Sequence, residues 1–135
     1  MKLQNLIEIA KMSLDSDDVP IGAIITKDGK IISQGFNTRE KDISVLGHAE
    51  INAILEASKV LGTWNLSDCE MYVTLKPCQM CTEIIKQSRF KNVYYLLEKP
   101  ASKREYNKTN FKKLTDEKME KEYQQLLQEF FRKLR

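Results

Sequence analysis

Apolar and polar positions follow two periods along the first part of the chain, and the change of period separates a helix from two strands. Residues 2–14 repeat apolar side chains three and four positions apart, which predicts an amphipathic helix. The apolar runs 21–26 and 30–36 flank the pair Asp28-Gly29, and an Asp-Gly pair between such runs is a strong hairpin signal. The chain is therefore expected to begin with a helix and a β-hairpin.

The middle of the chain alternates helical and extended patterns. A polar loop over residues 37–47 precedes a second predicted helix, which Gly62 is expected to stop. Residues 69–75 alternate and predict a strand, Pro77 is expected to open a third helix, and residues 92–97 predict a further strand. Strands separated by helices indicate a layered α/β domain whose sheet is at least partly parallel.

The last quarter of the chain combines a polar segment with a final helix. Residues 98–110 are rich in lysine and are expected to form a loop, after which Thr115 can cap a helix. One face of that helix is apolar, and we expect it to pack in the core; it consists of Met119, Tyr123, Leu126, Leu127, Phe130, Phe131 and Leu134. No boundary between domains is visible, so residues 1–135 are expected to form a single domain.

Composition and charge narrow the class of protein. Hydrophobic residues make up 41% and charged residues 30% of the 135 positions, which is typical of a globular protein. We expect neither a membrane span nor a secretory signal. We therefore expect a cytoplasmic protein. The formal charge of +3 is concentrated in residues 101–135, which hold ten Lys or Arg and six Asp or Glu. Such a segment could contact phosphates, but charge alone favours the solvated face of a helix.

Three cysteines indicate a reducing compartment rather than a disulfide scaffold. Cys69 falls on the apolar face of a predicted strand and is expected to be a buried thiol. Cys78 and Cys81 form a Cys-x-x-Cys at a predicted helix start, where both side chains share one face. With His48, the single histidine, they match a zinc site that has three protein ligands and an open position for water. The chain has no plausible fourth ligand, which favours a catalytic site over a structural one.

Glu50 lies two residues beyond His48, close enough to serve the same site without binding the metal. Zinc lowers the pKa of water from about 15.7 to roughly 7–9, and a neighbouring carboxylate can then carry protons. The alternative is an acid favoured by the helix dipole, and without the cysteines that interpretation would be preferred.

His-x-Glu followed by Pro-Cys-x-x-Cys is the signature of zinc-dependent nucleobase deaminases. Beyond that signature, the chain resembles the bacterial tRNA adenosine deaminases (TadA type), closely over residues 3–96 and loosely afterwards. The matching stretches are Val19-Pro20-Ile21-Gly22-Ala23, Gly35-Phe36-Asn37-Thr38-Arg39-Glu40, His48-Ala49-Glu50-Ile51, Leu66-Ser67-Asp68-Cys69, Met71-Tyr72-Val73-Thr74-Leu75, Gln87-Ser88-Arg89 and Phe130-Phe131-Arg132.

The resemblance implies a three-layer α/β/α cytidine deaminase-like fold with a mixed sheet of about five strands, and a homodimer. It implies one Zn²⁺ per chain and hydrolysis of adenosine to inosine at the wobble position (34) of a tRNA anticodon stem-loop. It also implies that Asn37 binds the flipped base; the residue in isolation would be an ordinary loop asparagine. Basic candidates for flanking phosphates are Lys103, Arg104 and Lys108, and, more weakly, Lys86 and Arg89.

The chain departs from the family pattern at several points. Lys76 replaces the usual glutamate before Pro-Cys, Gly47 replaces an alanine, Ser44-Val45 replaces Asp-Pro, and residues 98–114 are divergent. Lys76 could stabilise charge near the metal or point outward to phosphate. Two alternatives therefore remain: a small-molecule deaminase for guanine or a pyrimidine, and an inactive zinc-containing RNA-binding protein. The intact Glu50 argues against the latter.

Overall fold

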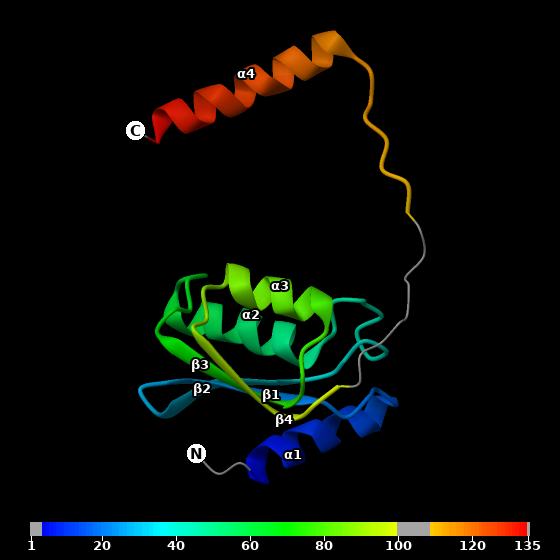
Figure 1. Cartoon of the computed structure of the whole chain (residues 1–135), viewed down its shortest axis with the longest axis vertical. Helices are drawn as coiled ribbons and strands as arrows, with labels where there is room; N and C mark the ends of the chain where they lie inside the picture. Colours follow the sequence, from blue (N-terminus) through cyan, green and yellow to red (C-terminus); the bar gives the residue numbers. More distant parts are fainter. Residues whose placement is uncertain (1–3, 100–108, 135) are drawn as a thin grey trace. The chain divides into compact units, whose positions relative to one another are not determined.

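The computed structural model describes residues 4–99 and 109–134, and the chain separates into two compact units, residues 1–102 and 103–135 (Figure 1). The first unit contains the sheet with three helices, and the second contains helix α4. The expectation of a single domain over residues 1–135 stays a prediction.

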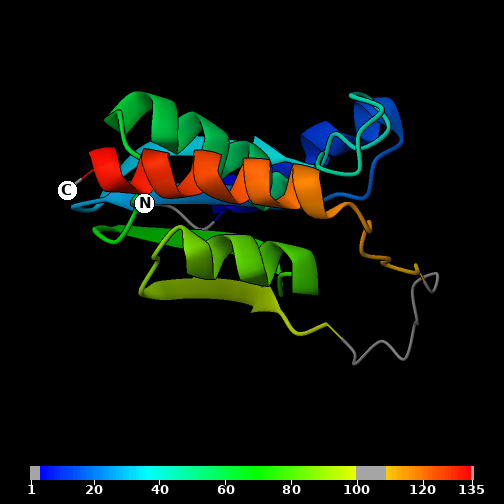
Figure 2. The ribbon, with the colours of Figure 1, turned by 90° about the horizontal axis from the view of Figure 1, so that it is seen from above.

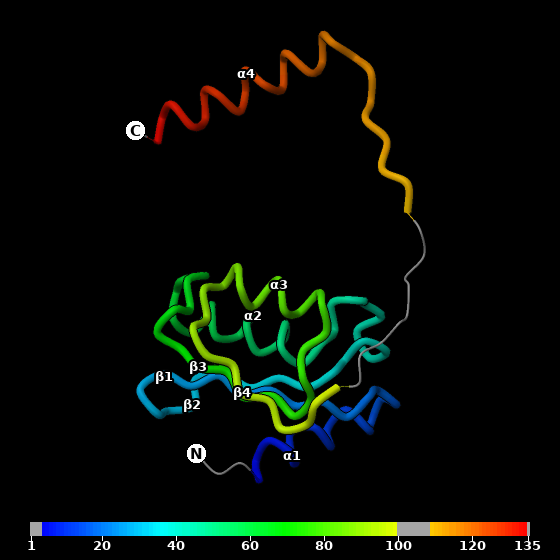
Figure 3. Tube along the Cα trace, in the orientation of Figure 1, coloured from blue at the N-terminus to red at the C-terminus, as the bar shows by residue number. Residues whose placement is uncertain are grey.

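The sheet of the first unit has four strands in the order β2-β1-β3-β4. The strands are β1 (Gly22–Lys27), β2 (Lys30–Phe36), β3 (Cys69–Leu75) and β4 (Asn92–Leu97). β1 pairs antiparallel with β2 and with β3. β3 pairs parallel with β4, and the chain between these two strands contains helix α3 (Gln79–Gln87) (Figure 3). The sheet is therefore mixed, as expected for an α/β domain.

The β1–β2 hairpin turns at the Asp-Gly pair that predicted it. Asp28 and Gly29 have φ values of 52° and 77°, and positive φ at both central residues is the requirement of the tight turn that suits twisted strands. The hairpin prediction is confirmed.

Helices cover both faces of the sheet, which confirms the three-layer arrangement. Helix α1 (Gln4–Lys11) packs on one face, while α2 (Ala49–Leu61) and α3 (Gln79–Gln87) lie side by side over the other (Figures 1 and 2). The expectation of about five strands is corrected to four among the described residues. The described residues that follow β4 and precede α4, 98–99 and 109–116, add no strand to this sheet.

Two helix boundaries differ from those predicted. The first α-helix ends at Lys11 and continues as a 3₁₀ helix (Met12–Ser16), which a left-handed Asp17 (φ 57°) terminates. The third helix begins at Gln79 with Cys78 at its N-cap position, so Pro77 precedes the helix instead of opening it. The second helix ends at Gly62 in the left-handed conformation, as predicted.

The core lies between the sheet and α2. Alternate residues of β3 (Cys69, Met71 and Val73) are buried there, which confirms the expected buried thiol. Gly35 on β2 allows α2 to approach closely, because a Cβ at this position would lie 2.4 Å from the carbonyl oxygen of Ala49. This close packing fixes the N-terminal end of α2, where the candidate site begins.

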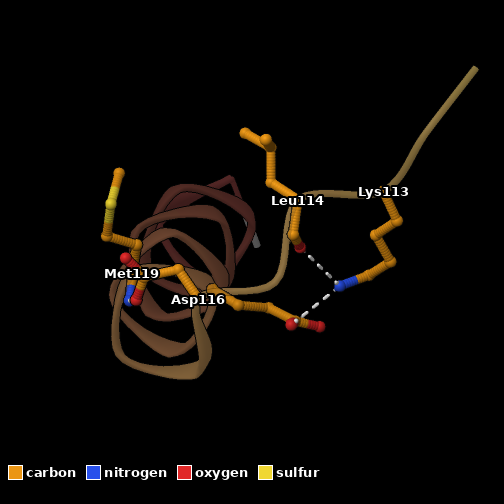
Figure 4. Close-up of polar contacts among 5 residues, drawn as sticks. Lys113, Leu114, Asp116 and Met119 are labelled. Atoms are coloured by element: carbon orange, nitrogen blue, oxygen red, sulfur yellow. Dashed lines mark hydrogen bonds and ion pairs between the residues drawn. The ribbon is translucent and has the colours of Figure 1, made fainter.

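The described part of the second unit contains one helix, α4 (Glu117–Lys133). Asp116 caps it by accepting a hydrogen bond from the backbone N–H of Met119 at 3.1 Å, so the cap is Asp116 and not Thr115. Lys113 Nζ donates to the carbonyl of Leu114 and to Glu120 Oε2 (Figure 4). The unit by itself offers α4 no packing partner among residues 109–134, so packing of the apolar stripe in a core stays a prediction.

Within the described residues, no helix has the length and apolarity that crossing a bilayer requires.

Candidate metal centre

Two helix starts meet at one place on the first unit and bring three metal-binding side chains together. His48 occupies the N-cap position of α2, and Cys78 occupies the N-cap position of α3. Cys81 lies one turn further along α3 and is fully buried. Because both helices cover the same face of the sheet, residues thirty positions apart in sequence become neighbours.

The spacing of the three side chains suits a tetrahedral ion. His48 Nδ1 lies 3.7 Å from Cys78 Sγ and 3.4 Å from Cys81 Sγ, and all three ligand atoms lie within 4.8 Å of one another. Zn–N bonds of about 2.0–2.1 Å and Zn–S bonds of about 2.3 Å at a tetrahedral angle place N and S about 3.6 Å apart. The group could therefore hold a metal ion, and its donors are those that zinc prefers.

The thiol of Cys81 needs a cation to become a thiolate. Burial raises its pKa far above the usual value, and the charges of Glu50 and Cys78 act in the same direction. The helix N-terminus favours a thiolate but does not outweigh these effects. A bound divalent ion is the partner that would stabilise the deprotonated sulfur.

Glu50 stands beside the ligands as a buried carboxyl group. Its side chain is 3% exposed, and its Oε1 is buried without a hydrogen-bond partner in the part of the chain that the structure describes. Burial raises the pKa of Glu50, while hydrogen bonds from its own backbone and from Cys81 oppose the rise. A buried, unpartnered oxygen of this kind is unusual and is typical of functional sites.

Asn37, at the end of β2, is buried next to the start of α2. Its Oδ1 accepts a hydrogen bond of 2.8 Å from the backbone N–H of Ala49, the residue after His48. Because that partner is a donor, the accepting atom must be the amide oxygen. The Nδ2 group has no acceptor among the described residues, so it remains a donor for another molecule.

Lys76, two residues before Cys78, forms an ion pair with Glu98. Its Nζ lies 2.9 Å from Glu98 Oε1, and the ammonium group lies 5.7 Å from the centre of the Tyr95 ring. The hydrogen bond to Glu98 raises the pKa of Lys76. The lysine charge is thus paired with Glu98 on an exposed surface, and the two roles considered for Lys76 stay predictions.

Other basic candidates lie apart from this group. The guanidinium of Arg89 sits over the ring of Trp64 at 5.7 Å, and Lys86 pairs with Glu83 at 3.9 Å. The candidates Lys103, Arg104 and Lys108 lie outside the described residues.

A network around the loop from residue 37 to residue 47 was not anticipated from the sequence. Asn52 Nδ2 donates to the carbonyl of Phe36 and to Thr38 Oγ1, each at 2.9 Å, and Asp18 accepts backbone hydrogen bonds from the same loop. No periodicity or motif marks these residues, because they act across the fold and not along one element.

Comparison with known proteins places the whole chain in one family. All of residues 1–135 match the family described as MafB19-like deaminase. The chain belongs to the MafB19-like deaminase family.

Two relatives of this deaminase are named tRNA-specific adenosine deaminases. The chain is 41% identical over 93 residues to the tRNA-specific adenosine deaminase of Streptococcus pyogenes serotype M18, covering 69% of this chain and 58% of that protein. It is 40% identical to the Bacillus subtilis protein of the same name, with the same coverage. The chain thus spans about three fifths of the length of these relatives.

Two solved deaminase structures superpose on this chain. A guanine deaminase from Bacillus subtilis superposes with a TM-score of 0.77 at 30% identity, covering 93% of this chain and 91% of that one. A structure from a study of A-to-I editing by tRNA:A34 deaminases at the wobble position superposes with a TM-score of 0.70 at 35% identity, covering 73% and 71%. These matches confirm the α/β deaminase fold and leave the substrate open between a tRNA and a free base.

Proposed function

We propose that this protein is a zinc-dependent deaminase that hydrolyses adenosine to inosine at the wobble position (34) of a tRNA anticodon stem-loop. The observation that carries the chemistry is the approach of His48 Nδ1, Cys78 Sγ and Cys81 Sγ within 4.8 Å beside the buried Glu50. In the reaction, water replaces the exocyclic amine of adenine, and ammonia leaves.

His48, Cys78 and Cys81 would hold one Zn²⁺ per chain. The donor set of one imidazole and two thiols supports zinc over magnesium or calcium, which prefer oxygen ligands. When bound, zinc supplies hydroxide near neutral pH by acidifying water, which is the nucleophile that amine hydrolysis requires. Three protein ligands leave one coordination position open for water.

Glu50 would carry the protons. Its raised pKa suits a group that must accept a proton from water and then release it to the departing amine. Its unpartnered Oε1 is available for both transfers, since no described residue occupies it. A carboxylate tied up in an ion pair could not serve in this way.

Asn37 would orient the base. Its oxygen is fixed by Ala49, so its Nδ2 is presented as a donor toward an acceptor of the substrate, such as a purine ring nitrogen. Base recognition in flipped nucleotides uses such edge contacts, and the surrounding phosphates would be held by basic residues of the chain.

The tRNA substrate rests on the relatives. Those with about 40% identity are named tRNA-specific adenosine deaminases, and the more distant sequence match, at 30%, is the guanine deaminase. A tRNA partner in turn supports a cytoplasmic protein. The homodimer is carried over from the family resemblance and is tested by the mass of the purified protein in solution.

A second candidate is deamination of free guanine. The specific observation in its favour is the match to the guanine deaminase, which covers nearly the whole of both chains. Guanine and adenine both present ring nitrogens to a donor such as Asn37 Nδ2, so the site alone accommodates either. An inactive RNA-binding protein is the third candidate, and the intact Glu50 counts against it.

The experiment offers zinc-loaded protein an anticodon stem-loop with adenosine at position 34, free guanine and free cytidine, and measures inosine, xanthine and uridine. Inosine in the stem-loop supports the proposal, and rapid conversion of guanine with an untouched stem-loop supports the second candidate. Glu50→Gln should lose turnover by about 10²–10⁴-fold while keeping zinc. Glu56→Gln, on the exposed face of the same helix, is the matched control and should retain activity.

A further inference from the structure

Asp18 is a buried carboxylate that holds a loop more than twenty residues away in sequence. It is 5% exposed, and its Oδ1 accepts a hydrogen bond of 2.7 Å from the backbone N–H of Glu40. Its Oδ2 accepts from Ser16 Oγ at 2.5 Å and from the backbone N–H of Lys41 at 3.3 Å. A carboxylate removed from water needs such donors, and most of them come from this loop.

Both ends of this loop, residues 37–47, lie next to the start of α2, where His48 is located. At one end, Asn37 bonds to the N–H of Ala49, and at the other end Gly47 precedes His48. The backbone N–H of Thr38 donates to the carbonyl of Gly47 at 2.8 Å and closes the loop. A displacement of the middle of the loop would therefore act first on Asn37 and Thr38, which lie at its first end.

The two ends and the middle of the loop are held by different elements. Asn52 on α2 holds the first end through the carbonyl of Phe36 and through Thr38 Oγ1. Asp18, which precedes β1, holds the middle at Glu40 and Lys41. Of the described side chains, Asp18 alone bonds this middle section from outside the loop, so the loop's position relative to the sheet depends on it.

We infer that Asp18 is a positioning residue for the proposed deamination, which fixes the loop over residues 37–47 so that Asn37 meets the substrate. The inference rests on the proposed function. Asp18 touches neither the metal-binding side chains nor Glu50, so its loss weakens substrate binding and leaves metal binding intact. A purely structural role would instead lower stability and zinc content together, without a specific effect on KM.

The test compares Asp18→Ala and Asp18→Asn with Asp17→Asn in the full-length, zinc-loaded protein. Asp17→Asn is the matched control, because Asp17 is exposed and asparagine tolerates its left-handed backbone. Asp18→Asn keeps one acceptor oxygen for Glu40 and also serves if the alanine variant fails to fold. The readouts are zinc per chain, amide hydrogen exchange at Glu40 and Lys41, and kcat and KM on the stem-loop.

Asp18→Ala should retain zinc, exchange both amides at least about tenfold faster and raise KM by about tenfold, as expected for a lost charge-assisted hydrogen bond. Asp18→Asn should fall between this variant and the wild type, and Asp17→Asn should match the wild type. Unchanged protection of the two amides overturns the inference, whatever the substrate, and so does an unchanged KM with faster exchange. A wild-type protein that leaves the stem-loop unconverted refutes the proposed function instead, and the exchange experiment, which needs no substrate, still decides whether Asp18 fixes the loop.

Discussion

Asn37 Oδ1 and the backbone N–H of Ala49 are joined by a hydrogen bond of 2.8 Å, which ties the end of β2 to the first residue of α2. The bond satisfies one of the donors that a helix start leaves unpaired, and it identifies the atom that accepts as the amide oxygen, so that Nδ2 is the donor half. One side chain therefore serves the fold with its oxygen and is available to a substrate with its nitrogen.

Asn37→Asp separates these two roles, because aspartate keeps the acceptor oxygen for Ala49 and loses the donor. We expect unchanged zinc content and a kcat/KM on the stem-loop that falls by about tenfold to a hundredfold, the value of a lost hydrogen bond in a buried site. Steady-state kinetics measure this. Asn65→Asp is the control, since Asn65 likewise accepts a backbone hydrogen bond through Oδ1, from Ser67, but on an exposed turn. Equal losses in the two variants would remove Asn37 from substrate recognition.

Gly47→Ala introduces the residue that the family resemblance leads one to expect before His48. In this chain, a Cβ at residue 47 would lie 2.6 Å from the backbone nitrogen of Arg39, so the loop must move. We expect the free energy of unfolding to fall by about 1–3 kcal/mol, the usual effect of overpacking, in urea denaturation. Glu40→Ala, an exposed substitution in the same loop, should change it little. Full stability in Gly47→Ala would mean that the loop accommodates a methyl group without cost.

Asp18 also predicts a response to acid. Burial would raise its pKa, but the hydrogen bonds from Glu40, Ser16, Lys41 and Arg39 outweigh burial and leave the pKa below its ordinary value. A depressed pKa in the folded state stabilises the protein above the unfolded pKa of about 3.9, and the contribution is lost as the pH falls through the folded value. The unfolding midpoint of the wild type should therefore exceed that of Asp18→Asn at pH 7, and the difference should shrink as the pH falls below the unfolded pKa of about 3.9. A difference between the two unfolding midpoints that stays constant as the pH falls would contradict a depressed pKa for Asp18.

Lys76 and Glu98 form an exposed ion pair that links the residues before Cys78 to the end of β4. Lys76→Glu puts like charges together and should lower the urea midpoint slightly at low salt, while Glu98→Lys added to it should restore the midpoint. In 1 M salt, where the screening length is about 3 Å, both differences should disappear. A change that persists in high salt would indicate that Lys76 acts through packing on Tyr95 and not through charge.

Local signals were sufficient to predict much of this fold and the approach of the site residues. The Asp28-Gly29 turn and the Gly62 helix stop require left-handed backbone, and the residue types that adopt it are few. His48 and Cys78 could be expected to meet because each begins a helix that follows a strand, and such helices can cover one face of a sheet. The residues at which helices begin could not be predicted as closely. Thr115 and Asp116 are both good N-cap residues for α4, and only the folded geometry selects Asp116.

Long-range contacts could not be predicted in this way. Asp18 bonds to residues 22 and 23 positions away, and nothing in the run Asp15-Ser16-Asp17-Asp18 indicates that its last acid has partners at Glu40 and Lys41. The expectation of five strands came from the family resemblance and not from a pattern in these residues, and the described residues form four.

The central claim is that His48, Cys78 and Cys81 bind one zinc ion on which turnover depends. The most direct measurement is zinc per chain together with inosine formed in the stem-loop for the wild type, Cys81→Ser and Cys69→Ser, each before and after chelation and zinc repletion. The account predicts about one zinc and full activity in the wild type and in Cys69→Ser, whose thiol lies in the core away from the site, and loss of both in Cys81→Ser. Activity that survives in zinc-free wild-type protein, or zinc that stays bound at full stoichiometry in Cys81→Ser, would contradict it.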